Sequence, residues 1–249
     1  LIEEKITKKT KAIIAVSLFG QTSDMEKINN LAKSHTNITV IEDAAQSFGA
    51  TYGNKRSCNL SKIGCTSFFP AKPLGCYGDG GAIFTNDEII DKVSRSIRIH
   101  GQKESYEYER VGLGGRMDTL QCAILLSKFK IFENEIILRK KISKRYDDIM
   151  DSLGIRRLTL RNNRTSVSAQ YCIFTNERQK IIQLLNDAEI PTAIYYPKPL
   201  NEQEAYKKFN SEFMPIASKT SKTILSLPMS AYLTEEEQNI IFDILNKYF

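Results

Sequence analysis

Two short, largely apolar runs near the start of the chain constrain its fold most strongly. They are Ala12-Ile13-Ile14-Ala15-Val16 and Ile38-Thr39-Val40-Ile41. Runs of this kind are typical of strands that are buried on both faces of a parallel sheet. A segment with helical periodicity, 25–32, follows a possible capping residue, Asp24, and further strand-like and helical segments continue to residue 98. This alternation predicts an α/β fold with a mostly parallel sheet and helices on both faces.

The pattern changes in the second half of the chain. Residues 117–153 have the periodicity of one long helical region, which could link two domains. Shorter elements follow, including a strand expected at 192–196, and they are typical of a small α+β domain. We therefore predict a partial large domain over residues 1–130. A linking helix and a small C-terminal domain are predicted over residues 131–249.

Composition restricts the classes of function. The chain has 35 Lys and Arg against 29 Asp and Glu, a formal charge of +6, and its densest basic stretch, 139–145, has acidic residues nearby. This pattern favours a solvated helix face over nucleic-acid binding. No apolar run reaches about 18 residues, so no membrane span is expected. Five cysteines without a C-x-x-C pair favour reduced thiols and a cytoplasmic location, and two histidines are too few for a His-based metal site.

Five short motifs lie in order in the first half of the chain. They are Glu42-Asp43-Ala44-Ala45-Gln46, Thr66-Ser67-Phe68-Phe69-Pro70-Ala71-Lys72, Gly78-Asp79-Gly80-Gly81, Arg98-Ile99-His100-Gly101 and Gly115-Arg116-Met117-Asp118. Each motif alone is weak, because an acid at a strand end and a lysine in a loop are common. Ligands of α/β sheets bind beyond the carboxyl ends of strands, where Asp43 is expected. The joint order of the five motifs is much more specific.

In this order and spacing the motifs resemble the DegT/DnrJ/EryC1/StrS family of sugar aminotransferases, which have the fold-type I architecture. The resemblance extends over essentially the whole chain. It implies pyridoxal phosphate as cofactor, held by Lys72 as a Schiff base, and a free Lys72 amine that moves a proton during amine transfer. It also implies that Asp43 contacts the pyridine nitrogen, Gln46 the ring or its hydroxyl, and Ser67 the phosphate. A turn or capping role is the alternative for Asp43, Gln46 and Ser67.

A second resemblance concerns the substrate. The segment containing Tyr195, Tyr196 and Asn201 is similar to a family loop, P-L-H-x-Q, with Asn201 in place of the His. With the Arg116 segment, it looks most like the subgroup that transfers an amino group from glutamate to UDP-2-acetamido-2-deoxy-3-oxo-glucuronate, for surface polysaccharide biosynthesis. Arg116 would bind the sugar carboxylate, because its guanidinium fork matches that shape. A structural ion pair is the alternative for Arg116.

Two departures from the family pattern leave alternatives open. Gly114 stands where the family has an Asn that reaches the phosphate of the neighbouring subunit. The family's first third, with a phosphate loop and a stacking aromatic residue, has no counterpart, so we expect an N-terminal segment to be missing. The alternatives are a 4-aminotransferase that acts on a nucleotide-linked 4-keto-6-deoxy sugar, and a truncated, non-catalytic chain that only dimerises. The resemblance implies a homodimer.

Overall fold

The computed structural model describes residues 1–35, 37–209 and 212–249, and these form two compact units. The first unit comprises Leu1–Asn134 and Leu160–Ala169, and the second comprises Glu135–Thr159 and Gln170–Phe249. The sequence-based division placed only residues 1–130 in the first domain. In the structure, residues 131–134 and the later segment Leu160–Ala169 also belong to the first unit.

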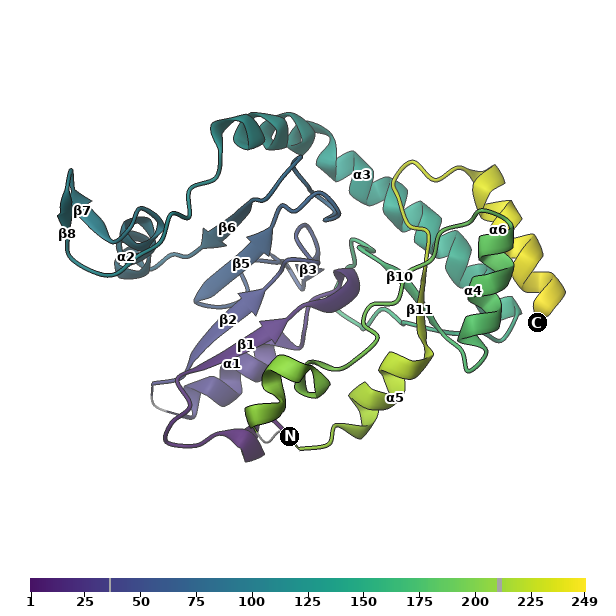
Figure 1. Ribbon diagram of the computed structural model, residues 1–249, viewed down its shortest axis with the longest axis horizontal. Coiled ribbons are helices and arrows are strands. Elements are labelled where there is room, and N and C mark those ends of the chain that lie inside the picture. Colours follow the sequence, from purple (N-terminus) through teal and green to yellow (C-terminus); the bar gives the residue numbers. More distant parts are fainter. Residues whose placement is uncertain (36, 210–211) are drawn as a thin grey trace. The chain divides into compact units, whose positions relative to one another are not determined.

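The first unit is built on a four-stranded sheet, whose strands lie side by side in Figure 1. In order across the sheet, the strands are β1 (Ala12–Val16), β2 (Thr39–Asp43), β5 (Ile63–Ser67) and β6 (Gly81–Phe84). Strands β1, β2 and β5 are parallel, and β6 is antiparallel to β5. The register pairs Asp43 with Val16 on one side and with Cys65 on the other. The carboxyl ends of three strands therefore lie at one edge of the sheet.

The two faces of this sheet differ in burial. Successive side chains on a strand point to opposite faces, and one face carries the buried Ala15 and Glu42 beside helix α1 (Met25–Lys33). On the other face, Ile14 is 64% and Val16 48% exposed. The sequence predicts helices on both faces, but in the described residues this second face of β1 is open. The apolar run therefore identified the strand correctly, while only one of its faces is buried.

The first unit contains further helices and short elements besides this sheet. Helix α2 (Glu88–Arg98) begins after Asp87, whose carboxylate accepts hydrogen bonds from the N–H groups of Ile89 and Ile90. This side-chain capping satisfies two donors that the helix itself leaves unpaired. The short elements are η1 (Glu3–Lys5), η2 (Leu18–Gly20), β3 (Thr51–Tyr52), β4 (Lys55–Arg56), β7 (Gln102–Glu104) and β8 (Glu107–Tyr108).

Asp24 stands at the N-terminus of α1, where the sequence predicts a capping residue. Its side chain makes no capping hydrogen bond. The carboxylate instead pairs with Arg164 at 2.6 Å and with Arg161 at 3.0 Å. The hydrogen bond from Arg164 lowers the pKa of Asp24. These ion pairs attach the segment Leu160–Ala169 to the first unit.

Helix α3 (Thr119–Ser152) is one unbroken helix of 34 residues, part of which belongs to each unit.

The second unit contains a three-stranded antiparallel sheet in the order β11-β10-β9. Its elements are β9 (Arg156–Arg157), β10 (Tyr171–Phe174), α4 (Arg178–Asp187), η3 (Leu200–Glu202), η4 (Glu204–Phe209), α5 (Pro215–Thr223), β11 (Ile224–Leu227) and α6 (Glu235–Tyr248). The prediction of a strand at 192–196 is wrong, because only a single bridge, between Ala193 and Ser226, forms there. No helix in the described parts of the chain has the length and apolar character to cross a membrane.

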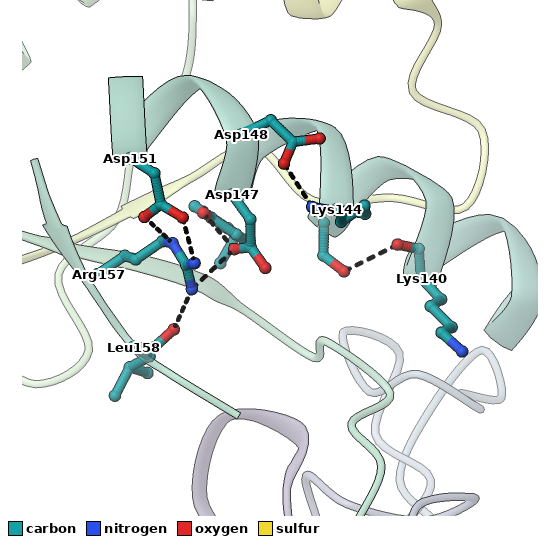
Figure 2. A network of polar contacts seen from close by, with 9 residues as sticks. Lys140, Lys144, Asp147, Asp148, Asp151, Arg157 and Leu158 are labelled. Atoms are coloured by element: carbon teal, nitrogen blue, oxygen red, sulfur yellow. Dashed lines mark hydrogen bonds and ion pairs between the residues drawn. The ribbon is translucent and has the colours of Figure 1, made fainter. Parts of the chain in front are cut away.

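Arg157 joins β9 to α3 through a network of charged side chains (Figure 2). Its guanidinium donates to both carboxylate oxygens of Asp151, at 2.9 and 2.8 Å, and lies 3.2 Å from Asp147. The hydroxyl of Tyr171 donates to Asp147 at 2.8 Å. Burial raises the pKa of Asp147, against the opposing effects of the Tyr171 hydrogen bond and the Arg157 charge. This network therefore connects the helix to the sheet in the second unit.

Candidate active site

Asp43 and Ser67 occupy the carboxyl ends of neighbouring strands in the first unit. The Asp43 carboxylate accepts a hydrogen bond from the N–H of Ala45 at 3.0 Å, and the Ser67 hydroxyl accepts one from Phe69 at 3.2 Å. Both side chains are half-buried. Because Asp43 is paired with Cys65, two residues before Ser67, the carboxylate and the hydroxyl lie at the same edge of the sheet.

Gln46 lies in the turn that follows β2, and its side chain is almost entirely buried. Its amide oxygen accepts a hydrogen bond from the backbone N–H of Phe19 at 2.6 Å. Phe19 lies after β1 and has a φ of 60°, in the left-handed region that few non-glycine residues adopt. Gln46 therefore connects the loops that follow two neighbouring strands. The sequence left a turn role open as the alternative for Gln46. The hydrogen bond from Phe19 gives the amide oxygen of Gln46 that role.

Lys72 lies in the loop that leads from β5 into β6. The base of this loop is closed by a hydrogen bond from the N–H of Phe68 to the carbonyl of Gly80, at 2.7 Å. A tight turn carries Lys72, because its own N–H donates to the carbonyl of Phe69 at 2.8 Å. The Lys72 side chain is half-buried. The lysine is therefore presented by a closed loop at the strand end that also holds Ser67.

The structure distinguishes the two adjacent acids, Glu42 and Asp43. Glu42 is fully buried and accepts hydrogen bonds from the Ser57 hydroxyl at 2.8 Å, Cys58 N–H at 2.9 Å and Leu60 N–H at 3.3 Å. Burial raises the pKa of Glu42. Asp43 points to the opposite face and has no ion-pair partner among the residues that the structure describes. Glu42 thus supports the fold, and Asp43 is the acid available for chemistry.

Arg116 lies in the first unit beside the loop that follows α2. Its guanidinium is exposed, with Nη1 3.5 Å from Nε2 of His100. A Cβ on Gly114 would lie 3.2 Å from Cε1 of the same imidazole, so the ring of His100 occupies the space beside Gly114. The sequence places His100 in one of the five motifs but indicates no role for its imidazole. The signal in the sequence was Gly114, because a residue without a side chain leaves room for a neighbouring ring such as that of His100.

The other three predicted site residues lie in the second unit. The rings of Tyr195 and Tyr196 are in edge-to-face contact, with centroids 5.7 Å apart, and both are partly exposed. The side-chain amide of Asn201 donates to the carbonyl of Glu212 at 3.2 Å. The structure therefore brings four predicted cofactor residues to one sheet edge in the first unit. It describes the predicted substrate residues as two separate groups, one in each unit.

The chemistry of the sheet-edge residues fits pyridoxal phosphate. The edge offers an amine from Lys72, which can bond to an aldehyde, and a carboxylate from Asp43, which can bond a protonated ring nitrogen. The hydroxyl of Ser67 and the amide of Gln46 are suited to phosphate and ring oxygens.

Comparison with known proteins agrees with this geometry. Residues 1–246 match the DegT/DnrJ/EryC1/StrS aminotransferase family. A Pseudomonas aeruginosa protein, UDP-2-acetamido-2-deoxy-3-oxo-D-glucuronate aminotransferase, is 50% identical over 241 residues, which are 97% of this chain and 67% of that protein. A DegT DnrJ EryC1 StrS aminotransferase from Brucella abortus is 39% identical with a TM-score of 0.89, over 96% of this chain and 64% of that one. The ntda protein of Bacillus subtilis, solved with bound cofactor PMP, is 28% identical with a TM-score of 0.88, over 99% of this chain and 58% of that one.

These similarities extend over nearly the whole chain, which spans about two thirds of the length of the relatives it matches. They confirm the predicted fold class, because the solved neighbours are aminotransferases of the same architecture. The resemblance stated from the motifs is also confirmed. The chain belongs to the DegT/DnrJ/EryC1/StrS aminotransferase family.

Proposed function

We propose that the protein transfers an amino group from glutamate to the 3-keto group of UDP-2-acetamido-2-deoxy-3-oxo-glucuronate, with pyridoxal phosphate as its cofactor. The observation that carries this proposal is the meeting of the Lys72 loop and the Asp43 strand end at one sheet edge. The choice of sugar is supported by the Pseudomonas aeruginosa relative that is named for it. The choice of cofactor is supported by the PMP bound to the Bacillus subtilis neighbour.

In this proposal each sheet-edge residue has a separate task. The cofactor supplies an electron sink for the substrate carbon. Lys72 would hold it covalently and, as a free amine, would move a proton at the amine-bearing carbon. Asp43 keeps the ring nitrogen protonated, because its negative charge favours the protonated form. Ser67 donates to the phosphate, and the amide of Gln46 contacts the ring while its oxygen holds the loop at Phe19.

Arg116 is assigned to the sugar carboxylate, with Tyr195, Tyr196 and Asn201 also contacting the substrate. The alternative for Arg116 was a structural ion pair, but the described residues contain no acidic partner for its guanidinium. An exposed guanidinium without a protein carboxylate suits a carboxylate on the substrate, which it can bind through two parallel hydrogen bonds.

The proposal also includes a homodimer in the cytoplasm that works in surface polysaccharide biosynthesis. The five cysteines are all thiols, which is consistent with a reducing compartment.

The test of the cofactor site is chemical trapping. The protein is incubated with pyridoxal phosphate, reduced with borohydride, and digested for peptide mapping by mass spectrometry. We expect the cofactor mass on the peptide that contains Lys72, and no such mass in Lys72→Arg. Labelling of Lys55 or Lys62 in its place would refute the assignment. The absence of any label would favour the non-catalytic alternative.

The substrate is tested separately by coupled turnover. Amino transfer from glutamate is measured with the 3-oxo-glucuronate sugar nucleotide and with a nucleotide-linked 4-keto-6-deoxy sugar. We expect turnover of the first, and a raised KM for it in Arg116→Gln, which removes the charge that binds the carboxylate. Turnover of the second sugar alone would establish the 4-aminotransferase alternative.

A further inference from the structure

We infer that Lys128 and Gln121, near the start of α3, position the loop that carries Lys72; the inference rests on the role proposed for Lys72. The ammonium of Lys128 donates to the carbonyl of Gly75 at 2.5 Å. The side-chain oxygen of Gln121 accepts a hydrogen bond from the N–H of Tyr77 at 2.8 Å. Both contacts join helix and loop residues that are more than forty positions apart in the sequence.

Gly75 links the Lys128 hydrogen bond to the turn at Lys72, because its backbone packs closely on that turn. A Cβ on Gly75 would lie 2.6 Å from the carbonyl oxygen of Pro70 and 2.7 Å from that of Phe69, so the backbone there is packed directly against this turn. The turn includes Phe69, whose carbonyl receives the N–H of Lys72. Lys128 therefore holds a backbone segment that is packed directly against the Lys72 turn.

The second contact holds the other side of the same loop. A Cβ on Gly78 would lie 3.2 Å from the side-chain nitrogen of Gln121, so this amide packs closely on the loop backbone. The ammonium of Lys128 also lies 5.7 Å from the centroid of the Tyr77 ring, a cation–π contact. Gln121 and Lys128 are seven residues apart and so face the same side of the helix. The loop is thus held at two points by one rigid element.

The chemical character of Lys128 makes it more than a space-filling residue. It is half-buried, and the described residues contain no carboxylate partner for its ammonium. A hydrogen bond from a charged donor to a carbonyl is stronger than a neutral one and fixes the carbonyl more firmly. A reacting amine needs a support of this kind, because small displacements of a catalytic group cost large factors in rate. We therefore class Lys128 and Gln121 as positioning residues.

The test measures loop protection in the protein without added cofactor. Lys128→Met keeps the length of the side chain but removes the donor, and Lys128→Arg keeps the cation. Lys130→Met is the matched control, because Lys130 is an exposed lysine on the same helix. We expect Lys128→Met to speed hydrogen exchange of the amides of residues 72 and 76 roughly tenfold. Lys130→Met should leave that exchange unchanged, and Lys128→Arg should restore most of the protection.

Gln121 provides an independent pair of variants. Gln121→Glu keeps an acceptor for the N–H of Tyr77, and Gln121→Met removes it. We expect faster exchange of the Tyr77 amide only in Gln121→Met. Unchanged exchange in both Lys128→Met and Gln121→Met would overturn the inference, whatever the cofactor does.

Trapping with borohydride then separates this inference from the proposed function. We expect Lys128→Met to need several-fold more pyridoxal phosphate for half-maximal labelling of Lys72, with Lys130→Met at the wild-type value. Unaltered labelling with a loosened loop would overturn the positioning role. Faster exchange in Lys128→Met together with no labelling of Lys72 in the wild type would refute only the proposed function.

Discussion

The side-chain oxygen of Gln46 lies 2.6 Å from the backbone nitrogen of Phe19, 27 residues earlier in the chain. This single hydrogen bond joins the loop after β1 to the turn after β2, next to the end of the strand that carries Asp43. Because Gln46 is almost entirely buried, little water is available to replace either partner.

Removing the Gln46 amide should therefore destabilise the first unit. We expect Gln46→Ala to lower the free energy of unfolding by about 1–3 kcal/mol, because the N–H of Phe19 loses its acceptor. Urea denaturation measures the change. Gln179→Ala is the matched control, since Gln179 is an exposed glutamine on α4, and its effect should stay within about 0.5 kcal/mol. Equal effects of the two variants would mean that the Phe19 contact contributes no stability.

The buried acid Glu42 should make stability depend on pH. Burial raises the pKa of Glu42 in the folded protein above its ordinary value of 4.5, so the folded state holds this proton more tightly than the unfolded chain. Its contribution is therefore fully present below pH 4.5 and is lost as the pH rises through the raised pKa. The difference in unfolding free energy between Glu42→Gln and wild type should grow in favour of the variant over that window. Parallel pH profiles for the two proteins would contradict a raised pKa.

Truncation of the same side chain should have the opposite consequence. Glu42→Ala leaves the N–H groups of Cys58 and Leu60 and the hydroxyl of Ser57 without their acceptor. We expect a loss of about 3 kcal/mol in unfolding free energy at neutral pH, since each unsatisfied buried donor costs about 1–3 kcal/mol. Thermal unfolding monitored by circular dichroism should show Glu42→Ala well below Glu42→Gln. Equal midpoints would show that these donors find water instead.

Asp43 should respond to substitution through activity and not through stability. Asp43→Asn keeps an oxygen that can accept the N–H of Ala45 but removes the charge that favours a protonated ring nitrogen. We expect amino transfer to slow by about two orders of magnitude or more, with the unfolding midpoint nearly unchanged. Single-turnover kinetics with bound pyridoxal phosphate measures the effect. Full activity in Asp43→Asn with a loss in Glu42→Gln would show that the wrong acid was chosen.

Exposed apolar side chains on α3 lead us to expect a homodimer. Leu120 is 70%, Leu126 68% and Phe129 55% exposed in the single chain, and exposed apolar surface of this kind suits an interface between subunits. Sedimentation equilibrium should give twice the chain mass of 28.3 kDa. A species of 28.3 kDa at micromolar concentration would contradict the expectation. Leu126→Glu should shift the equilibrium toward that monomer if this part of the helix is covered in the dimer.

Local sequence patterns predicted the strands of the first unit well, and those of the second unit poorly. The apolar run at Ala12–Val16 coincides with β1, because five consecutive apolar residues are too short for a helix and suit a sheet. The run Ile224–Leu227 forms a fully buried strand that was not predicted, since it follows α5 directly and contains Ser226. Residues 192–196 have a similar local pattern but contribute only one bridge, between Ala193 and Ser226. Whether such short segments become strands depends on the partner strand and not on their own residues.

The order of residues along the chain was enough to indicate which chemical groups the site can contain. The joint order and spacing of the five motifs between residues 42 and 118 sufficed for the resemblance to the family, which the family match over residues 1–246 confirms. These are local properties of the chain, and they do not depend on how remote segments pack.

Long-range packing selects the neighbouring groups that support that site. Alternation along β2 places Glu42 and Asp43 on opposite faces, but the packing of residues 57–60 against one face decides which acid is buried. The contact of Gln46 with Phe19, and that of Lys128 with Gly75, join residues 27 and 53 positions apart. Such contacts depend on where complete strands and helices come to lie, and no local periodicity encodes their distance in space.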